Sequence, residues 1–271
     1  MTAATTVPFL SHVRIAFRPE IAVDAVRVAA STADAAFRAA AESAVPQKQA
    51  LPVAPPDPTV LQAADAADRL RARIPADLYP YFNVYLYVSK AAAGSLAQHM
   101  YVFHKDDAAG LVFEQSLPVS TGRERHERYF TSTPEGLFEL DPNRFERTHY
   151  SRTWHGAAMP WAMFLDAVIR GRQTGVALHS ADVHAYQLGQ RASGGCVRLP
   201  PQKAQELFDR FQAEEHGMVP VFAYDASQRR TNGEGRVLRD AHGQPLLTPG
   251  FRVLVFIEDY EGAPALVALV A

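Results

Sequence analysis

The chain contains one cysteine, Cys196, which lies in the segment ASGGCVRL at residues 192–199. A single cysteine forms neither an intrachain disulfide nor a multi-cysteine metal site, so it is either a small buried hydrophobe or a nucleophile. The neighbouring Gly194 and Gly195 would let backbone N–H groups approach a substrate carbonyl closely, as an oxyanion hole requires. A cation two residues on, Arg198, would favour the thiolate. These neighbours indicate a cysteine nucleophile.

A nucleophilic cysteine needs a base, because a free thiol with a pKa of about 8.5 is mostly protonated at neutral pH. His179 follows the apolar run GVAL and lies 17 positions before Cys196 (196 − 179 = 17), which leaves room for one loop between adjacent strands. A strand end holds a side chain more rigidly than a loop does. His179 is therefore the predicted base, with a purely structural histidine as the alternative. His155 and His184 are expected to be polar loop residues.

Composition excludes several classes of protein. The chain has 27 Lys and Arg against 29 Asp and Glu, a formal net charge of −2, so no nucleic-acid partner is predicted. No run approaches the roughly 18 consecutive apolar residues of a membrane helix, and Met1–Ser11 lacks a basic stretch followed by an apolar one. We therefore expect no transmembrane span and no readable secretory signal. No metal site or other cofactor is predicted.

The predicted secondary structure that positions these residues changes along the chain from helices to strands. Pro19–Ala44 is Ala-rich and favours one or two helices, five prolines between residues 46 and 58 indicate a linker, and helical spacing returns over Thr59–Ile74. After Tyr79, short aromatic and β-branched runs predict an antiparallel β domain. The predicted strands are Phe82–Val88, His99–His104, Gly110–Val119, Gly136–Leu140, Trp161–Leu165 and Gly175–His179.

A helix is predicted directly after the cysteine segment, over Pro201–Phe211, because prolines suit a first helical turn and apolar residues follow at helical spacing. Further strands are predicted at Val219–Tyr224, Phe251–Ile257 and Ala265–Val270. The predicted fold is thus α+β overall. It comprises a helical segment with a proline-rich linker at 1–75, a mainly β catalytic domain at 76–225 and a β extension at 226–271.

Six separated motifs resemble the L,D-transpeptidase (YkuD-type) family in their order and spacing. They are PVSTG at 118–122, TPEGLF at 133–138, MPWAMF at 159–164, ALHS at 177–180, LG at 188–189 and ASGGCVRL at 192–199. The resemblance extends over residues 81–224 and implies a β-sandwich or barrel with a helix after the catalytic loop. One position departs from the family, which usually reads Ser-His-Gly-Cys where this chain has a glycine, Gly194. That departure bears on substrate choice.

The resemblance also implies a reaction. Cys196 would attack a peptide carbonyl of a peptidoglycan tetrapeptide stem, release D-Ala and form a thioester, which an amine of a second stem or of a wall-linked lipoprotein would resolve. His179 would take the thiol proton and Ser180 would help to orient the imidazole. The oxyanion and substrate would be bound by Ser193, Gly194, Gly195, Arg198 and Trp161. The expected location is the periplasm or cell envelope.

Two other functions remain open on the sequence. Water in place of the amine would make the protein an L,D-carboxypeptidase or an amidase that releases a wall-bound lipoprotein. Loss of activity would leave a non-catalytic peptidoglycan-binding module, against which the joint presence of Cys196, His179 and Arg198 argues. For Arg198, a structural role that bonds loop carbonyls is as plausible as substrate binding.

Overall fold

The computed structural model describes residues 58–125, 131–231 and 233–263 of the chain. The helices predicted within Pro19–Ala44 and the strand predicted at Ala265–Val270 lie outside the described residues. The described elements are α1 (Pro58–Arg73), the 3-10 helix η1 (Ala76–Tyr81), β1 (Val84–Ser89), β2 (His99–Asp106), β3 (Gly110–Pro118), β4 (Gly136–Ser151), β5 (Ala157–Leu165), β6 (Val168–Ile169), β7 (Arg172–Gln173), β8 (Ala177–Ser180), the 3-10 helix η2 (Asp182–Gln187), β9 (Val197–Leu199), α2 (Pro201–Glu214), β10 (His216–Pro220), β11 (Tyr224–Asp225), β12 (Arg230–Thr231), β13 (Leu247–Phe251) and β14 (Val253–Glu258).

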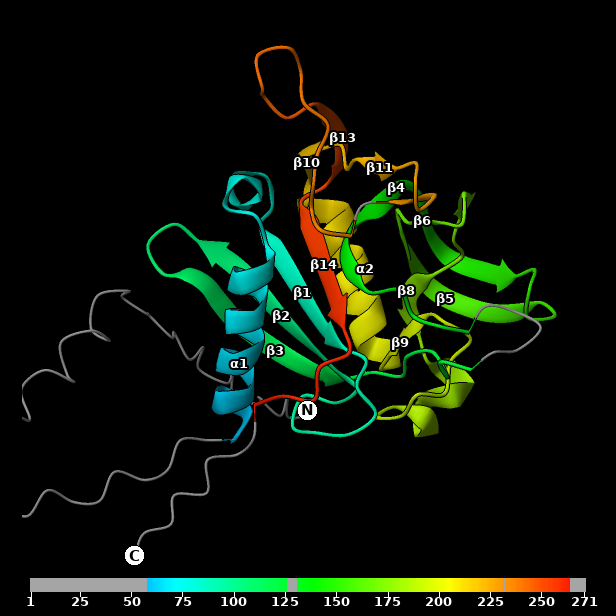
Figure 1. The fold of residues 1–271 in the computed structure, drawn as a ribbon. Coiled ribbons are helices and arrows are strands. Elements are labelled where there is room, and N and C mark those ends of the chain that lie inside the picture. Colours follow the sequence, from blue (N-terminus) through cyan, green and yellow to red (C-terminus); the bar gives the residue numbers. More distant parts are fainter. Residues whose placement is uncertain (1–57, 126–130, 232, 264–271) are drawn as a thin grey trace, which may run out of the picture.

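One eight-stranded sheet organises the molecule, with strand order β3-β2-β1-β14-β4-β5-β8-β9 (Figure 1). Most neighbouring strands are antiparallel, as the sequence predicts. Two pairs are parallel, β1 with β14 and β8 with β9, so the expectation of a wholly antiparallel domain is wrong at these two places. Parallel neighbours require a crossover connection rather than a tight turn. The crossover between β8 and β9 contains η2 and the cysteine segment.

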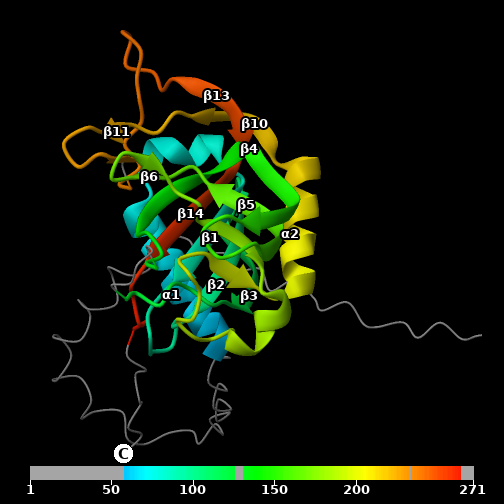
Figure 2. The ribbon, with the colours of Figure 1, turned by 90° about the vertical axis from the view of Figure 1, so that its right-hand side faces the viewer.

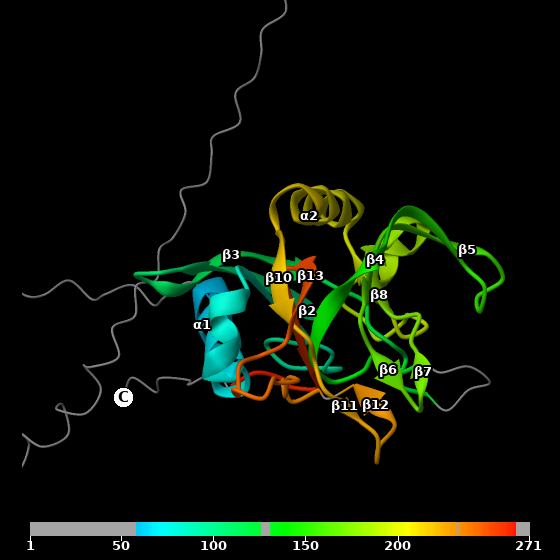
Figure 3. The same ribbon diagram turned by 90° about the horizontal axis from the view of Figure 1, so that it is seen from above.

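Both faces of the sheet are covered, and the alternation of side chains along β1 shows how. Val84, Leu86 and Val88 point into a core that contains the apolar face of α2, whereas Tyr85 and Tyr87 point into a second core that contains α1. The two helices therefore lie on opposite faces of the sheet (Figure 3). Because every position of β1 is buried, Val84–Val88 is a continuous run of aliphatic and aromatic residues rather than an alternation of apolar and polar ones.

The predicted mainly β, α+β fold is confirmed, with a helix before the strands and another directly after the cysteine segment (Figure 2). Helix α2 begins at Pro201, as predicted. Helix α1 buries Ala63 and Ala66, whereas Leu61 is largely exposed. Neither of the two α-helices in the described part of the chain is long and apolar enough to cross a membrane.

The β4–β5 hairpin is much longer than predicted. Strand β4 continues to Ser151 and β5 starts at Ala157, so five residues, 152–156, form the turn between them. A shift in the pairing register between Leu140 and Phe145 interrupts the ladder where the predicted strand would have ended. The hairpin beyond this irregularity carries its turn to the cysteine segment, as described below.

The C-terminal part of the described chain contributes a central strand. Strand β14 lies between β1 and β4, and its alternating residues enter both cores. Strands β10 and β13 form a separate two-stranded sheet, seen at the top of Figure 1. The domain limits at residues 75 and 225 stay predictions. Whatever those limits are, the eight-stranded sheet includes a strand from beyond residue 225.

Candidate functional site

The parallel pairing of β8 and β9 brings the predicted nucleophile and base together. His179 lies opposite Arg198 and Leu178 lies opposite Val197, the residue that follows Cys196. A cavity of about 420 Å³ opens at this point. Its lining includes Cys196, His179, Ser180, Arg198, Ser193 and Gly194. Six of the eight residues predicted for the site therefore line one cavity.

The loop before Cys196 is closed by its own hydrogen bonds. The Ser193 hydroxyl donates to the Cys196 carbonyl oxygen at 2.5 Å and accepts from the Gly195 N–H at 3.0 Å. The Gly195 backbone has a φ of +116°, a conformation that side chains rarely adopt. Because the Gly195 N–H is already bonded within the loop, it could serve an oxyanion only after leaving Ser193. The substrate-binding roles of Ser193 and Gly195 stay predictions.

The Cys196 side chain is half-buried against apolar side chains. It packs against Met159, Ala162, Phe164 and Ala177, and its thiol donates to the Gly175 carbonyl oxygen at 3.5 Å. Burial raises the pKa of the Cys196 thiol above its usual value, although the Ala177 backbone N–H and the guanidinium of Arg198 act in the opposite direction. The thiol is therefore protonated at neutral pH.

The His179 imidazole is almost completely buried, with 6 % of its surface exposed. Burial, together with the positive charge of Arg198, lowers the pKa of His179 to about 4. Its Nδ1 atom has no hydrogen-bond partner among the described residues. The Ser180 hydroxyl accepts from the Asp182 N–H at 3.1 Å rather than bonding to the imidazole, so an orienting role of the Ser180 side chain stays a prediction. At neutral pH the His179 imidazole is therefore uncharged.

Arg198 is anchored at both its backbone and its side chain. Its backbone exchanges hydrogen bonds with Ser120, and its Nη1 donates to the Gln187 side-chain oxygen at 2.6 Å. Within residues 58–263 as described, no carboxylate forms an ion pair with it, and burial lowers its pKa. These contacts are compatible with both predicted roles, since the guanidinium is fixed in place and also lines the cavity.

Trp161 lies elsewhere than the predicted cavity wall. Its ring makes an edge contact with Phe208 of α2 at 5.6 Å between centroids, and the Arg147 guanidinium lies over its face. It is not among the residues that line the cavity. The indole that does line the cavity belongs to Trp154, in the β4–β5 turn. Sequence reasoning missed Trp154 because the polar turn around it belongs to none of the recognised motifs.

Two further lining residues were given no site role in the sequence analysis. Arg123 follows the STG motif, and its guanidinium lies 5.3 Å from the centre of the Trp154 ring. His184, expected to be a loop residue, lies in η2, and its Nδ1 is buried without a partner among the described residues. Burial lowers its pKa as well. The cavity therefore holds two histidines, of which His179 is the more deeply buried.

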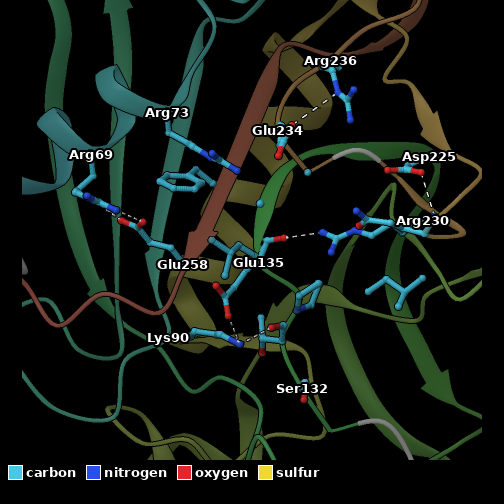
Figure 4. A pocket seen from close by; sticks show the side chains of 18 of the residues that line it. Arg69, Arg73, Lys90, Ser132, Glu135, Asp225, Arg230, Glu234, Arg236 and Glu258 are labelled. Carbon is cyan, nitrogen blue, oxygen red and sulfur yellow. Dashed lines mark hydrogen bonds and ion pairs between the residues drawn. The ribbon is translucent and has the colours of Figure 1, made fainter.

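A second cavity, of about 700 Å³, is lined in part by Lys90, Ser132 and Glu135 (Figure 4). At its floor Lys90, only 4 % exposed, makes ion pairs with Glu124 and Glu135 at 3.1 Å and donates to the Thr133 carbonyl oxygen at 2.9 Å. The Thr133 hydroxyl in turn donates to the Gly195 carbonyl oxygen at 2.9 Å and accepts from the Gly122 N–H at 2.8 Å. A buried polar network thus fixes the loop that precedes Cys196.

The comparison with protein families agrees with these motifs. A family model described as the L,D-transpeptidase catalytic domain matches residues 84–240, more than half of the chain. The solved structure of the L,D-transpeptidase LdtMt1 in complex with imipenem is similar at 16% sequence identity, over 65% of this chain and 59% of that chain, with a TM-score of 0.37. The alignment thus spans about three fifths of that protein's length. No curated protein sequence matches the chain.

Proposed function

We propose that this chain, which belongs to the L,D-transpeptidase catalytic-domain family, is a peptidoglycan acyltransferase whose nucleophile is Cys196. The observation that carries the proposal is the shared cavity of Cys196, His179 and Arg198, in which the pairing of β8 with β9 brings His179 to the segment that contains the other two. The proposed acyl donor is a tetrapeptide stem of peptidoglycan. The proposed location is therefore the periplasm or cell envelope.

In the proposed first step, the Cys196 Sγ attacks the carbonyl carbon before the terminal D-Ala while His179 takes the thiol proton. The tetrahedral intermediate then collapses, the C–N bond breaks, and the proton passes from the imidazolium to the departing D-Ala amine. A thioester on Cys196 remains. An acceptor amine attacks this thioester, gives its proton to His179, and forms a new amide as the Cys196 thiol is regenerated.

The charge states of Cys196 and His179 favour proton transfer during the attack. They do not favour a thiolate–imidazolium ion pair formed before the substrate binds. Burial raises the pKa of the Cys196 thiol and lowers that of His179, so both groups are neutral before substrate binds. The proton therefore moves as the S–C bond forms. Arg198, whose charge no described carboxylate neutralises, would attract a carboxylate of the stem.

Analysis of muropeptides would identify the acceptor of the acyl group. The purified protein is incubated with peptidoglycan and the muropeptides are separated by mass. We expect new crosslinks made at the position of the released D-Ala, and none with Cys196→Ala. Shortened stems without crosslinks would instead assign the hydrolytic function, and unchanged muropeptides would refute the enzymatic proposal. A lipoprotein acceptor is tested by adding a lysine-containing lipoprotein peptide and measuring its attachment to stems.

A further inference from the structure

The turn of the β4–β5 hairpin places an indole against the glycine two residues before the nucleophile. A Cβ atom on Gly194 would lie 2.6 Å from both Nε1 and Cε2 of Trp154, closer than real Cβ contacts allow. The backbone of Gly194 is not in the left-handed region, unlike that of Gly195. The neighbouring indole, rather than backbone conformation, therefore excludes a side chain at position 194.

The turn fixes the backbone of Trp154. The Trp154 backbone N–H donates to the Ser151 hydroxyl at 3.2 Å, and the Trp154 carbonyl oxygen accepts from the Ala157 backbone N–H at 2.9 Å. The Arg123 guanidinium lies over the ring at 5.3 Å, a cation–π arrangement. Trp154, Arg123 and Cys196 all line the 420 Å³ cavity. The Trp154 ring thus forms part of the wall of the cavity that contains the proposed nucleophile.

We propose that Trp154 is a specificity-determining residue that contacts the acyl donor through the face or edge of its indole. The proposal rests on the proposed function of Cys196, because it concerns the donor that this cysteine would attack. An aromatic wall contacts the aliphatic part of a peptide by dispersion and excludes bulkier groups from the same space. In this cavity the Trp154 ring occupies the space into which a side chain at position 194 would project.

The first test uses the kinetics of acylation of Cys196 by a carbapenem, followed by stopped-flow absorbance over a range of concentrations. Trp154→Gly removes the wall and leaves Cys196 and His179 unchanged. We expect the concentration for half-maximal rate to rise about tenfold and the maximal rate to stay within about threefold, because a lost binding contact weakens affinity without slowing the chemistry. Unchanged values of both would overturn the proposal.

The second test uses fluorescence, since the chain contains only two tryptophans. In Trp161→Phe all indole emission comes from Trp154, and in the matched control Trp154→Phe it comes from Trp161, which packs on α2. With a synthetic tetrapeptide stem as ligand, emission should change in the first variant and stay constant in the second. A change only in the second variant, or in neither, would contradict contact between Trp154 and the donor.

A third test isolates the steric relation from catalysis. Gly194→Ala should lower the melting temperature in the wild-type background and should cost much less in the Trp154→Gly background. Gly175→Ala serves as the control for stability, because a Cβ there meets nothing within 4 Å. Equal losses in both backgrounds would show that the indole does not limit position 194. If the wild type forms no carbapenem adduct at all, the proposed function fails. The melting temperatures still test whether Trp154 limits the side chain at position 194.

Discussion

Burial favours the neutral form of both the proposed nucleophile, Cys196, and the proposed base, His179. It raises the pKa of the Cys196 thiol and lowers the pKa of His179 to about 4, so the neutral form of each group is favoured. A neutral imidazole is able to accept a proton. The His179 imidazole can therefore accept a proton over a pH range that extends well below the usual pKa of histidine.

The pH dependence of acylation follows from this. A histidine with the usual pKa of about 6.5 would lose about nine tenths of its base form by pH 5.5. With a pKa of about 4, His179 stays neutral there, so the rate of Cys196 acylation should change little between pH 7 and 5.5 and should fall as pH approaches 4. Stopped-flow kinetics measure the acylation rate at each pH, and circular dichroism confirms that the protein stays folded. A midpoint near 6.5 would contradict this assignment.

The two cavity histidines are distinguished by substitution. A positioned base contributes about 10²- to 10⁴-fold to a rate, so His179→Ala should slow acylation by that order. His184→Ala should slow it far less, because His184 lies in the 3-10 helix η2 rather than at the end of β8 beside the cysteine. Acylation rates of both variants at pH 7 provide the measurement. The reverse order of effects would assign the base to His184.

Much of the site could be predicted from residue types because its motifs are local. Cys196, His179 and Arg198 belong to short segments whose order and spacing are specific, and these segments meet through the pairing of β8 with β9. Trp154 could not be predicted in this way. Its place in the cavity depends on where a long hairpin ends, and no residue near it forms a motif. The empty side-chain position at Gly194 was the one available signal, and it does not identify what fills the space.

The segment that contains Thr133 supports the loop that precedes Cys196. Its hydroxyl joins the Gly195 carbonyl oxygen to the Gly122 N–H in a buried position. Thr133→Val keeps the shape of the side chain and removes both hydrogen bonds. Because two buried polar groups lose their partner, unfolding should become easier by about 1–3 kcal/mol, and acylation should slow as the loop loosens.

Chemical denaturation and acylation kinetics of Thr133→Val test this role. Ser132→Ala is the matched control, since the neighbouring serine lines the second cavity but makes no bond to Gly195. Its stability and rate should stay near those of the wild type. A Thr133→Val protein as stable and as active as the control would show that the network does not position the loop.

Prediction of elements from sequence succeeded where apolar patterns are strong and failed where they are weak. Helix α2 and the buried strand β1 were predicted nearly at their observed bounds. The part of β4 beyond Leu140 was missed because DPNRFERTH, at residues 141–149, is polar and has no fully buried residue. Its strand conformation comes from pairing with β5, a tertiary contact that local propensity does not encode.

The eight-stranded sheet depends on β14, which is the last strand in the described part of the chain. Strand β14 pairs with both β1 and β4, and Val255 and Phe256 enter the two opposite cores. Truncation after Arg252 should therefore abolish cooperative thermal unfolding, because both cores lose a central strand. Truncation after Ala263 keeps every described element and should retain a cooperative transition. Calorimetry distinguishes the two, and a cooperative transition in the shorter form would refute a central role for β14.

Intact-protein mass spectrometry tests whether Cys196 carries the acyl group in the proposed transfer. A carbapenem, which acylates as a mimic of the stem, is incubated with the wild type and with Cys196→Ala. The substitution replaces a small side chain by a smaller one and should leave the fold intact, as circular dichroism would verify. We predict that the wild type gains the mass of one carbapenem and that the variant gains none. An adduct that persists in Cys196→Ala, or its absence from the folded wild type, would contradict the assignment.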